Sequence, residues 1–314
     1  MKRKIAVAFS AINDSRLERI KSIAPDFDVV VTNEDINDAE VIFGNVRPAL
    51  LADAKKLKWM HTQTAGVNTY LAPGIVLPQE LVMTNSSGAF NIGIAEHLLV
   101  MAMMLLRKMG AYRQNQNSHK WENLGAYRNI FGAEVCIVGL GDIGRRFAVL
   151  CKALGAKTTG VVRNPRKQPP DFTDAIFTAD RLDEAISTAD IVALCLPGTD
   201  ETSNLFDAAR LSKMKPGSII LNIGRGSAIN GEALADALQS GRIAGAGLDV
   251  THPEPLPESS PLWDMPNVII TPHISGRDSE GLTLDLVFEK FCRYLEEYVA
   301  GRPFDRVVDQ KAGY

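Results

Sequence analysis

Short apolar runs alternate with segments of helical periodicity through the first part of the chain. The apolar runs are KIAVAFS, FDVVVT, EVIFGN and WMHTQT, and the helical patterns SRLERIKSI and PALLADAKKL lie between them. Such alternation is typical of a parallel sheet whose strands are joined by crossover helices. We therefore expect the first part of the chain to form an α/β domain.

A second, longer series of the same kind begins at EVCIVGLGDIG, residues 134–144. Its further apolar runs are KTTGVVR, IVALCLP, SIILNIG, IAGAGLDV and VIITPH, separated by helical patterns such as RRFAVLCKALG and GEALADALQS. Two series of this length predict an α/β protein with two doubly wound parallel sheets.

Two long helical patterns, at about residues 90–109 and 280–300, are expected to connect these domains. The simplest arrangement is a smaller, flavodoxin-like substrate domain of residues 1–88 and 278–314. A Rossmann-type dinucleotide-binding domain of residues 89–277 is then inserted into it. A chain of 314 residues that is 46% hydrophobic is long enough for two cores. The two crossings would form a hinge over an interdomain cleft.

The charge balance narrows the classes of partner. The 34 basic and 37 acidic residues give a formal net charge of −3, which provides no overall field to attract nucleic acid or anionic lipid. The apolar run Leu98–Leu106 is too short to cross a bilayer. We expect neither a nucleic acid nor a membrane as partner.

The cysteines and the N-terminus favour a reducing, cytoplasmic location. Cys136, Cys151, Cys195 and Cys292 are far apart and lie mostly in apolar runs, as buried thiols do. The basic N-terminus has only a short apolar segment and no cleavage pattern, so it is predicted to be a strand rather than a signal peptide. No His, Cys, Asp or Glu pair shows metal-ligand spacing with partners, so no metal is predicted.

The turn GLGDIG follows an apolar strand and precedes a helix. Gly139 would allow the tight turn, Gly141 would let the backbone approach a pyrophosphate, and Gly144 would let the helix pack closely on the strand. A glycine-rich turn without a ligand is the less favoured alternative. We predict a dinucleotide site that includes Asp142 and Ile143 between these glycines.

A cluster of cations, RNPRK, stands where the next strand ends. Dinucleotide folds usually place an acidic residue there to bind the adenosine ribose, and this chain has Arg163 instead. A guanidinium can hold a 2′-phosphate with paired, charge-assisted hydrogen bonds. We therefore predict NADP(H) as cofactor, bound by Arg163, Asn164 and Arg166 beside Lys167, with NAD(H) less favoured. The alternative is a solvated loop of charges.

Three further polar residues follow strands or loops of the second series, where ligands bind in open parallel sheets. Arg225 comes after SIILNI between two glycines and could bind an anionic substrate, although such an arginine is more often part of a surface ion pair. His273 follows NVIIT, and Glu254 lies in a proline-rich loop. A carboxylate beside an imidazole favours the imidazolium and orients it for proton transfer. From the residues alone, a structural histidine stays an open alternative.

An ordered series of motifs resembles the D-isomer-specific 2-hydroxyacid dehydrogenase family over about residues 40–283. The motifs are GLGDIG, LPGTDETSNLF, MKPGSIILNIGRG, EALADALQSGRIAGAGLDV, PEPLP and NVIITPHISG. In the first domain, WMHTQTAGVNTY and VMTNSSGAFNIGIAEHLL are similar to the family's substrate loop and to the start of its hinge helix. The first forty residues match only in pattern.

The resemblance implies a role for each matching residue. Arg225 would bind the substrate carboxylate and polarise the keto group, with help from the backbone N–H groups of Ala65 and Gly66. His273 would be the general acid in reduction and the general base in oxidation, held by Glu254. The implied cofactor contacts are Asp249 on the nicotinamide carboxamide with the carbonyl group of Ile223, and Pro197 and Thr202 along the cleft.

Many family members carry Asp where this chain has Arg163, which favours the glyoxylate/hydroxypyruvate reductase type that uses NADPH. In the family the region of residues 94–112 forms a twofold interface, so a homodimer is expected. His61 and His97 are expected to have packing or hydrogen-bonding roles.

The leading hypothesis is thus an oxidoreductase that reduces a 2-keto acid to a D-2-hydroxy acid with NADPH. Corepressors built on the same scaffold give the alternative, an NAD(P)-sensing interaction protein, but they are expected to carry docking features or tails that this sequence does not show. Phosphoglycerate-type oxidation with NAD would need cations that QTAGVNTY does not supply. The residues leave the identity of the 2-keto acid and the cellular direction open.

Overall fold

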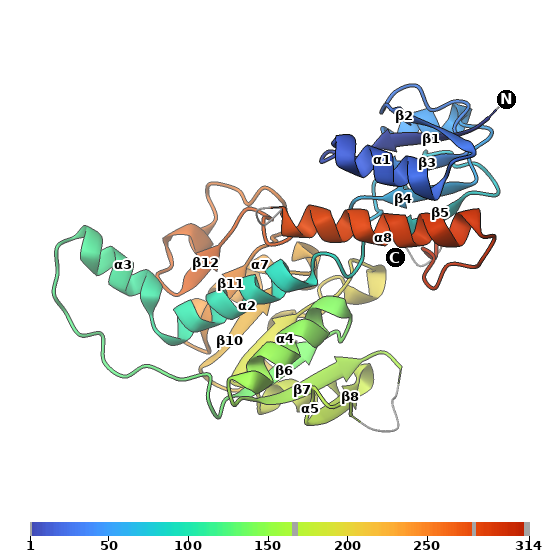
Figure 1. Ribbon diagram of the computed structural model, residues 1–314. Helices are drawn as coiled ribbons and strands as arrows, with labels where there is room; N and C mark the ends of the chain where they lie inside the picture. The colour runs from blue at the N-terminus through green and yellow to red at the C-terminus, as the bar shows by residue number, and fades with distance from the viewer. Residues whose placement is uncertain (1, 165–168, 278–280, 311–314) are drawn as a thin grey trace. The chain divides into compact units, whose positions relative to one another are not determined.

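The computed structural model describes residues 2–164, 169–277 and 281–310. The chain divides into two compact units (Figure 1). Unit 1 contains residues 1–90 and 278–314, and unit 2 contains residues 91–277. The assignment of substrate binding to the first unit and cofactor binding to the second stays a prediction.

Unit 1 contains a five-stranded sheet in the order β2-β1-β3-β4-β5, and every neighbouring pair is parallel. This is the flavodoxin-like strand order. The strands are β1 (Arg3–Ala8), β2 (Phe27–Val31), β3 (Val41–Gly44), β4 (Trp59–Thr62) and β5 (Val82–Asn85). The helices are α1 (Asp14–Ile23), the 3₁₀ helix η1 (Pro48–Asp53) and α8 (Leu282–Val299).

The two faces of this sheet bury alternate residues, as the twofold repeat of a strand requires. Ile5 and Val7 pack in a core with Phe291 of α8, while Ala6, between them, packs in a second core with Met60. Both faces of the sheet are thus covered, as expected for a parallel sheet.

Unit 2 contains a seven-stranded parallel sheet in the order β12-β11-β10-β9-β6-β7-β8. The strands are β6 (Glu134–Val138), β7 (Lys157–Val162), β8 (Ala175–Thr178), β9 (Ile191–Leu194), β10 (Ser218–Asn222), β11 (Ile243–Leu248) and β12 (Val268–Ile270). Counted from β6, the order is the Rossmann arrangement with one further strand. The predicted fold class, two doubly wound α/β domains, is confirmed.

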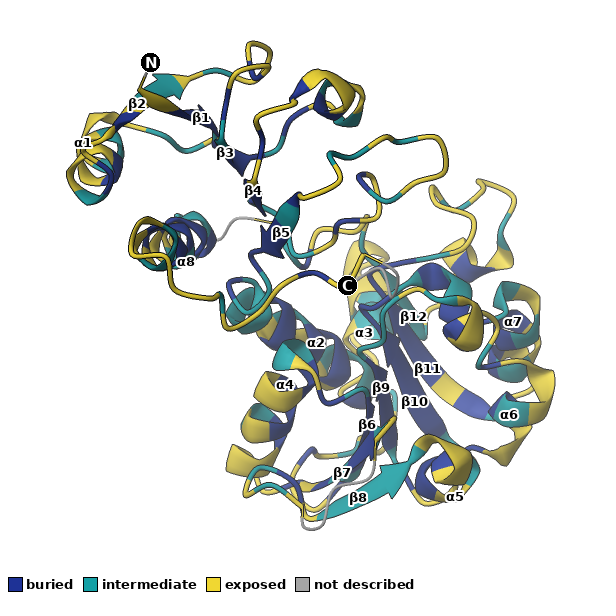
Figure 2. Ribbon diagram, turned by 90° about the vertical axis from the view of Figure 1, so that its right-hand side faces the viewer, coloured by how far each residue is buried: buried dark blue, intermediate teal, exposed yellow. Residues whose placement is uncertain are grey.

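Helices cover both faces of the second sheet, and Figure 2 shows its central strands as buried ribbons between them. The helices α2 (Asn91–Leu106) and α4 (Asp142–Ala153) pack against each other. The residues of α5 (Leu182–Ser187), α6 (Ala208–Lys213) and α7 (Gly231–Gln239) share one core with the strands. The remaining elements of this unit are α3 (Met109–Asn117) and the 3₁₀ helices η2 (Ala179–Arg181), η3 (Asp200–Thr202), η4 (Gly226–Ala228) and η5 (Pro261–Asp264).

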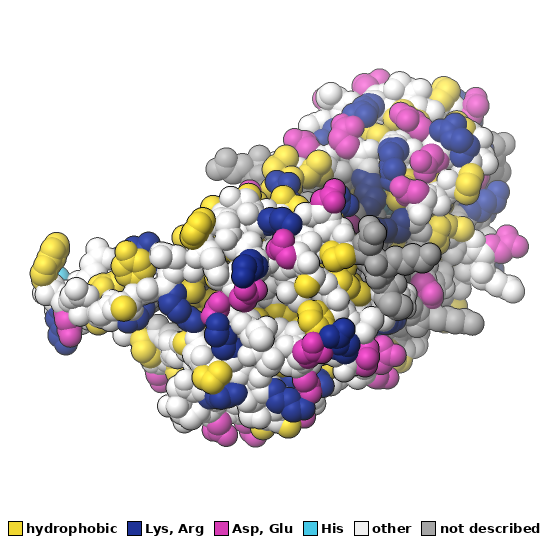
Figure 3. Space-filling model, turned by 90° about the horizontal axis from the view of Figure 1, so that it is seen from below, with side chains coloured by type: hydrophobic (Ala, Val, Ile, Leu, Met, Phe, Trp, Pro, Cys, Tyr) yellow, Lys and Arg dark blue, Asp and Glu magenta, His cyan; other side chains and the backbone are white. Residues whose placement is uncertain are grey.

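The predicted long connecting helix is interrupted. It ends at Leu106, and Lys108 has a left-handed backbone with a φ of 57° before α3 begins at Met109. Figure 1 shows α3 projecting from the body of unit 2. On the face shown in Figure 3, basic and acidic side chains are interspersed rather than gathered by sign.

Candidate active site

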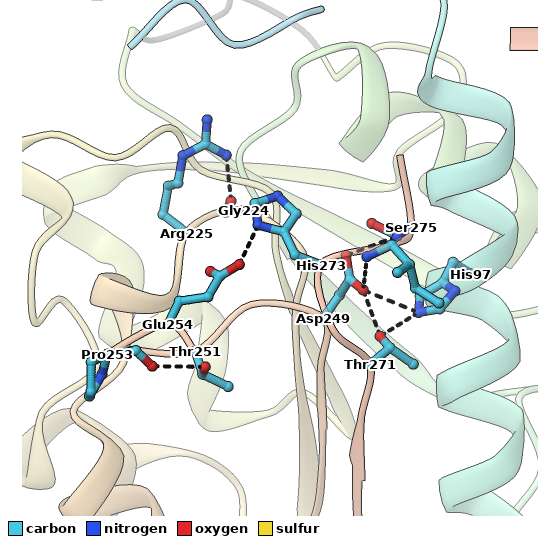
Figure 4. Close-up of polar contacts among 11 residues, drawn as sticks. His97, Gly224, Arg225, Asp249, Thr251, Pro253, Glu254, Thr271, His273 and Ser275 are labelled. Carbon is cyan, nitrogen blue, oxygen red and sulfur yellow. Dashed lines mark hydrogen bonds and ion pairs between the residues drawn. The ribbon is translucent and has the colours of Figure 1, made fainter. Parts of the chain in front are cut away.

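Three neighbouring strands of unit 2 end at the same edge of the sheet. Asn222 of β10 pairs with Leu248 of β11, which pairs with Ile270 of β12. Because the strands are parallel and in register, the residues that follow them emerge together. This edge therefore carries Arg225, Asp249 and His273 (Figure 4).

His273 and Glu254 form a close pair. The distance from His273 Nδ1 to Glu254 Oε1 is 2.7 Å, and about half of each side chain is exposed to solvent. A carboxylate accepts hydrogen bonds, so Nδ1 carries the shared proton. The other ring nitrogen, Nε2, is then the atom that can exchange a proton with a substrate.

The backbone of His273 has an unusual conformation. Its φ is 52°, in the left-handed region that residues other than glycine seldom adopt. The His273 N–H donates to the carbonyl oxygens of Asp249 (2.8 Å) and Thr271 (3.0 Å). These bonds hold the turn that presents the imidazole to Glu254.

The Asp249 side chain is buried directly behind this turn. Its carboxylate accepts hydrogen bonds from the Thr271 hydroxyl (2.6 Å) and from the backbone N–H groups of Ile274 (2.9 Å) and Ser275 (3.1 Å). Burial alone would raise the pKa of Asp249, but hydrogen bonds from Ser275, Thr271 and Ile274 outweigh it and hold the pKa below its usual value. The predicted contact of Asp249 with a nicotinamide carboxamide stays a prediction.

Arg225 is held by a tight turn after β10. The buried Asn222 side chain donates to the Arg225 carbonyl oxygen (3.0 Å) and accepts from the Gly224 N–H (3.1 Å). A Cβ atom at Gly226 would lie 1.8 Å from the Thr251 carbonyl oxygen, so only glycine fits there. The Arg225 Nη1 donates to the Gly224 oxygen (2.8 Å), and in Figure 4 the guanidinium projects from the same edge as the His273–Glu254 pair.

The glycine turn lies between β6 and α4. Gly139 has a φ of 100°, and a Cβ atom there would lie 2.6 Å from the Cys195 carbonyl oxygen. A Cβ atom at Gly144 would lie 2.0 Å from the oxygen of Gly139. At Gly141, the N-cap of α4, an added Cβ atom would meet nothing within 4 Å. The turn thus leaves open the helix N-terminus, the kind of place where backbone N–H groups bind a pyrophosphate.

The other predicted cofactor residues of unit 2 follow the neighbouring strands β6, β9 and β10. Asp142 and Ile143 begin α4, Pro197 follows β9, Thr202 ends η3, and the buried Ile223 follows β10. The Thr202 hydroxyl donates to the Pro197 carbonyl oxygen (2.8 Å) and so helps to fix the loop. The cofactor contacts of these residues stay predictions.

Arg163 follows β7, as predicted, and is exposed. Its Nη2 lies 3.2 Å from Glu201 Oε2, in an ion pair that no local sequence pattern predicts. Asn164 is exposed beside it. Arg166 and Lys167, the other cations of the predicted cluster, lie outside the described residues.

In unit 1, the predicted substrate loop follows β4. The Asn85 side chain donates to the Ala65 carbonyl oxygen (2.8 Å), and the Thr64 hydroxyl donates to the Gly66 carbonyl oxygen (2.9 Å). These bonds use carbonyl groups of the loop, so they do not occupy the N–H groups of Ala65 and Gly66 that are predicted to bind a carboxylate. Sequence reasoning missed Asn85, and its only signal was a polar residue at the end of a strand.

The loop stands beside a buried polar cluster. His61 Nδ1 lies 2.7 Å from the Thr84 hydroxyl, and Nε2 lies 3.2 Å from the Ser86 hydroxyl, which donates to the Thr62 carbonyl oxygen. Burial, with a smaller effect of the Lys290 charge, lowers the pKa of His61 to about 3. His61 is therefore neutral and structural, in accord with its expected hydrogen-bonding role.

Within residues 2–164, 169–277 and 281–310, no three His, Cys, Asp or Glu side chains gather in a way that could hold a metal ion. In the same described ranges, every helix is too short or too polar to cross a membrane.

The chain is similar to known proteins in sequence and in fold. A relative from Corynebacterium melassecola, named only as an uncharacterized protein in the proB 3′ region, is 34% identical over 291 residues, which are 90% of this chain and 92% of that protein. The chain spans about half the length of the curated D-3-phosphoglycerate dehydrogenases it matches.

Two solved structures are similar over their whole length. One is a D-isomer specific 2-hydroxyacid dehydrogenase from Xanthobacter autotrophicus in complex with NADPH and MES, which is 25% identical with a TM-score of 0.84. The other is an NADPH-dependent glyoxylate/hydroxypyruvate reductase from Sinorhizobium meliloti in complex with NADP and sulfate, which is 26% identical with a TM-score of 0.83. Each similarity covers 100% of both chains.

The sequence model of the NAD binding domain of the D-isomer specific 2-hydroxyacid dehydrogenases matches residues 99–275. This range includes the glycine turn, Arg225, Glu254 and His273. The resemblance seen in the sequence is confirmed, and the chain belongs to the D-isomer specific 2-hydroxyacid dehydrogenase family.

Proposed function

We propose that this protein reduces a small 2-keto acid to a D-2-hydroxy acid, with NADPH as the preferred reductant. The observation that carries the proposal is the 2.7 Å contact between His273 Nδ1 and Glu254 Oε1, at the strand edge that also carries Arg225. In a chain of this family, these three side chains supply a proton donor, its orienting carboxylate and an anion-binding cation.

Each residue has a definite part in the proposed reaction. Arg225 binds the substrate carboxylate and polarises the keto group, with the N–H groups of Ala65 and Gly66 as further donors. Bound NADPH supplies a hydride to the carbonyl carbon. His273 gives its Nε2 proton to the carbonyl oxygen, and Glu254 accepts the Nδ1 hydrogen bond and stabilises the imidazolium until that proton has left.

The open turn at Gly139, Gly141 and Gly144 supports binding of the cofactor pyrophosphate in unit 2. The NADPH preference is supported by Arg163, which stands where an acidic residue would repel a 2′-phosphate. Glu201 is its exposed partner, and an exposed ion pair is worth only about 0–1 kcal/mol, so a phosphate could replace that carboxylate. Both similar structures named above contain NADP or NADPH.

A homodimer is the proposed assembly. Helix α2, helix α3 and the segment after α3 expose large apolar side chains, and exposed apolar patches mark interaction sites. The side chains are Val100 and Met103 of α2, Met109 of α3, and Trp121 and Tyr127 after α3. Light scattering on the purified protein tests this directly, because a mass near 34 kDa would contradict a dimer.

The deciding experiment is the initial rate of NADPH and NADH oxidation with glyoxylate, hydroxypyruvate, branched and aromatic 2-keto acids. Faster turnover with NADPH supports the whole proposal, and Arg163→Asp should then raise the KM for NADPH far more than that for NADH. Arg302→Asp, at an exposed site after α8 in unit 1, is the matched control. Cofactor binding without turnover of any acid would overturn the reductase proposal, and a preference for NADH would overturn the role of Arg163.

A further inference from the structure

His97 of α2 is linked to the His273 turn by a chain of hydrogen bonds. His97 Nε2 lies 3.0 Å from Thr271 Oγ1, and Thr271 Oγ1 lies 2.6 Å from Asp249 Oδ1. The same carboxylate accepts the N–H groups of Ile274 and Ser275, the two residues that follow His273. Figure 4 shows this chain on the side of His273 away from Glu254.

The direction of each hydrogen bond follows from the chemistry of the groups. The Asp249 carboxylate is an acceptor, so Thr271 must use its only hydroxyl proton on Asp249. The Thr271 oxygen can then only accept from His97, so His97 Nε2 carries a proton. If His97 Nε2 were an acceptor, the Thr271 hydroxyl would donate to it instead. The buried Asp249 carboxylate would then lose one of its donors.

The Asp249 carboxylate needs these donors because its side chain has no exposure to solvent. With both oxygens held, it fixes two successive backbone N–H groups and thereby the left-handed turn at His273. Without the His97 donor, Thr271 can rotate, the carboxylate can move, and the turn loses the constraint that keeps His273 Nδ1 in reach of Glu254.

We propose that His97 is a positioning residue for the general acid His273, acting through Thr271 and Asp249. This proposal rests on the proposed function for the role of His273, but the hydrogen-bond chain itself does not depend on which reaction is catalysed. It gives α2 a part in the active site beyond packing.

Two variants of His97 distinguish a role as hydrogen-bond donor from a role in packing alone. Gln places an amide N–H near the position of Nε2, so His97→Gln should keep the hydrogen-bond chain from residue 97 to Asp249. Leu has no donor and is of similar size, and only about a fifth of the His97 side chain is exposed, so His97→Leu should break the hydrogen-bond chain without unfolding the protein. Circular dichroism and the melting temperature of both variants confirm that they fold.

The kinetic test uses full-length enzyme, NADPH and whichever 2-keto acid the wild type reduces fastest. We expect His97→Leu to lower kcat about tenfold while the Kd for NADPH stays within about twofold, because misplacing an acid affects the chemical step. His97→Gln should recover most of kcat. Unchanged kcat in His97→Leu, or an equal loss in both variants, would overturn the proposal.

Hydrogen exchange on the ligand-free protein tests the hydrogen-bond chain from His97 to Asp249 independently of activity. Amides in residues 271–277 should exchange about tenfold faster in His97→Leu than in wild type, and at the wild-type rate in His97→Gln. If wild type reduces no 2-keto acid, the proposed function fails, yet faster exchange in His97→Leu still supports the positioning chain. Exchange that is the same in all three proteins overturns it.

Discussion

His61 at the end of β4 and His273 after β12 both stand at the carboxyl end of a parallel sheet, but their surroundings differ completely. His61 has no solvent exposure and contacts two neutral hydroxyl groups. His273 is half exposed and contacts the carboxylate of Glu254. Burial without a counter-charge removes the charged form of an imidazole, whereas an exposed site beside a carboxylate lets the ring carry and release a proton.

The comparison teaches that neither residue type nor position at a strand end identifies a catalytic histidine. The neighbours decide. The hydroxyl groups of Thr84 and Ser86 hold the His61 ring, and Ser86 also bonds the carbonyl oxygen of Thr62, just before the loop of residues 63–66. His61 therefore has a structural role. Glu254 and the left-handed turn make His273 a group that can serve a substrate.

The largest expected effect is the loss of the exposed histidine. His273→Ala should lower kcat about 10³-fold, because a positioned general acid contributes roughly 10²–10⁴ to the rate, while the Kd for NADPH stays unchanged. Single-turnover rates and cofactor fluorescence measure the two quantities. Full activity in His273→Ala would remove the distinction between the two histidines.

The next effect concerns the partner that distinguishes the two sites. Glu254→Gln keeps the shape of the side chain but removes the charge, so we expect a loss of about 10²-fold in kcat. Glu258→Gln, a change in the same exposed loop, is the matched control and should leave kcat unchanged. Equal rates for wild type and Glu254→Gln would show that the imidazole needs no carboxylate.

A smaller effect is expected at the loop that the His61 cluster supports. Asn85→Ala removes the donor to the Ala65 carbonyl oxygen, and the loss of one hydrogen bond corresponds to about fivefold. We expect this as a rise in the KM for the 2-keto acid with little change in kcat. Ser87→Ala is the control, because only its backbone N–H contacts Asn85. A fall in kcat without a change in KM would contradict a substrate-binding role for this loop.

Much of the fold was open to prediction because its signals are local. Apolar runs and the turn at Gly139 indicated the second parallel sheet, and the clashes of a Cβ atom at Gly144 explain why that position tolerates no larger residue. The edge strand β8 was missed because it is short and its four residues are only partly buried. The break at Lys108 was missed because the nearest glycine, Gly110, lies inside α3 rather than at the break.

The site was predictable only in part, for a different reason. Arg225, Glu254 and His273 could be selected from motifs, but their contacts depend on how distant segments meet. His97 and Thr271 are 174 residues apart, and Arg163 meets Glu201 from another strand end. Those hydrogen bonds and ion pairs follow from strand order and register, which no local pattern contains.

The last prediction separates the two histidines by the pH dependence of stability rather than by a reaction rate. The pKa of His61 is lowered from 6.5 to about 3 in the folded protein, so between these values the unfolded chain binds a proton that the folded chain does not. The free energy of unfolding should therefore fall as the pH is lowered from about 6.5 towards 3, with His61 contributing about 1.4 kcal/mol per pH unit. His61→Gln should remove this contribution and flatten the pH dependence of the free energy of unfolding, as measured by urea unfolding.

Met60→Leu, a buried change beside His61 without a titratable group, should lower stability at every pH without altering the slope of that free energy against pH. An unchanged slope in His61→Gln would mean that His61 takes up its proton in the folded state, and the contrast with His273 would then have to rest on geometry alone.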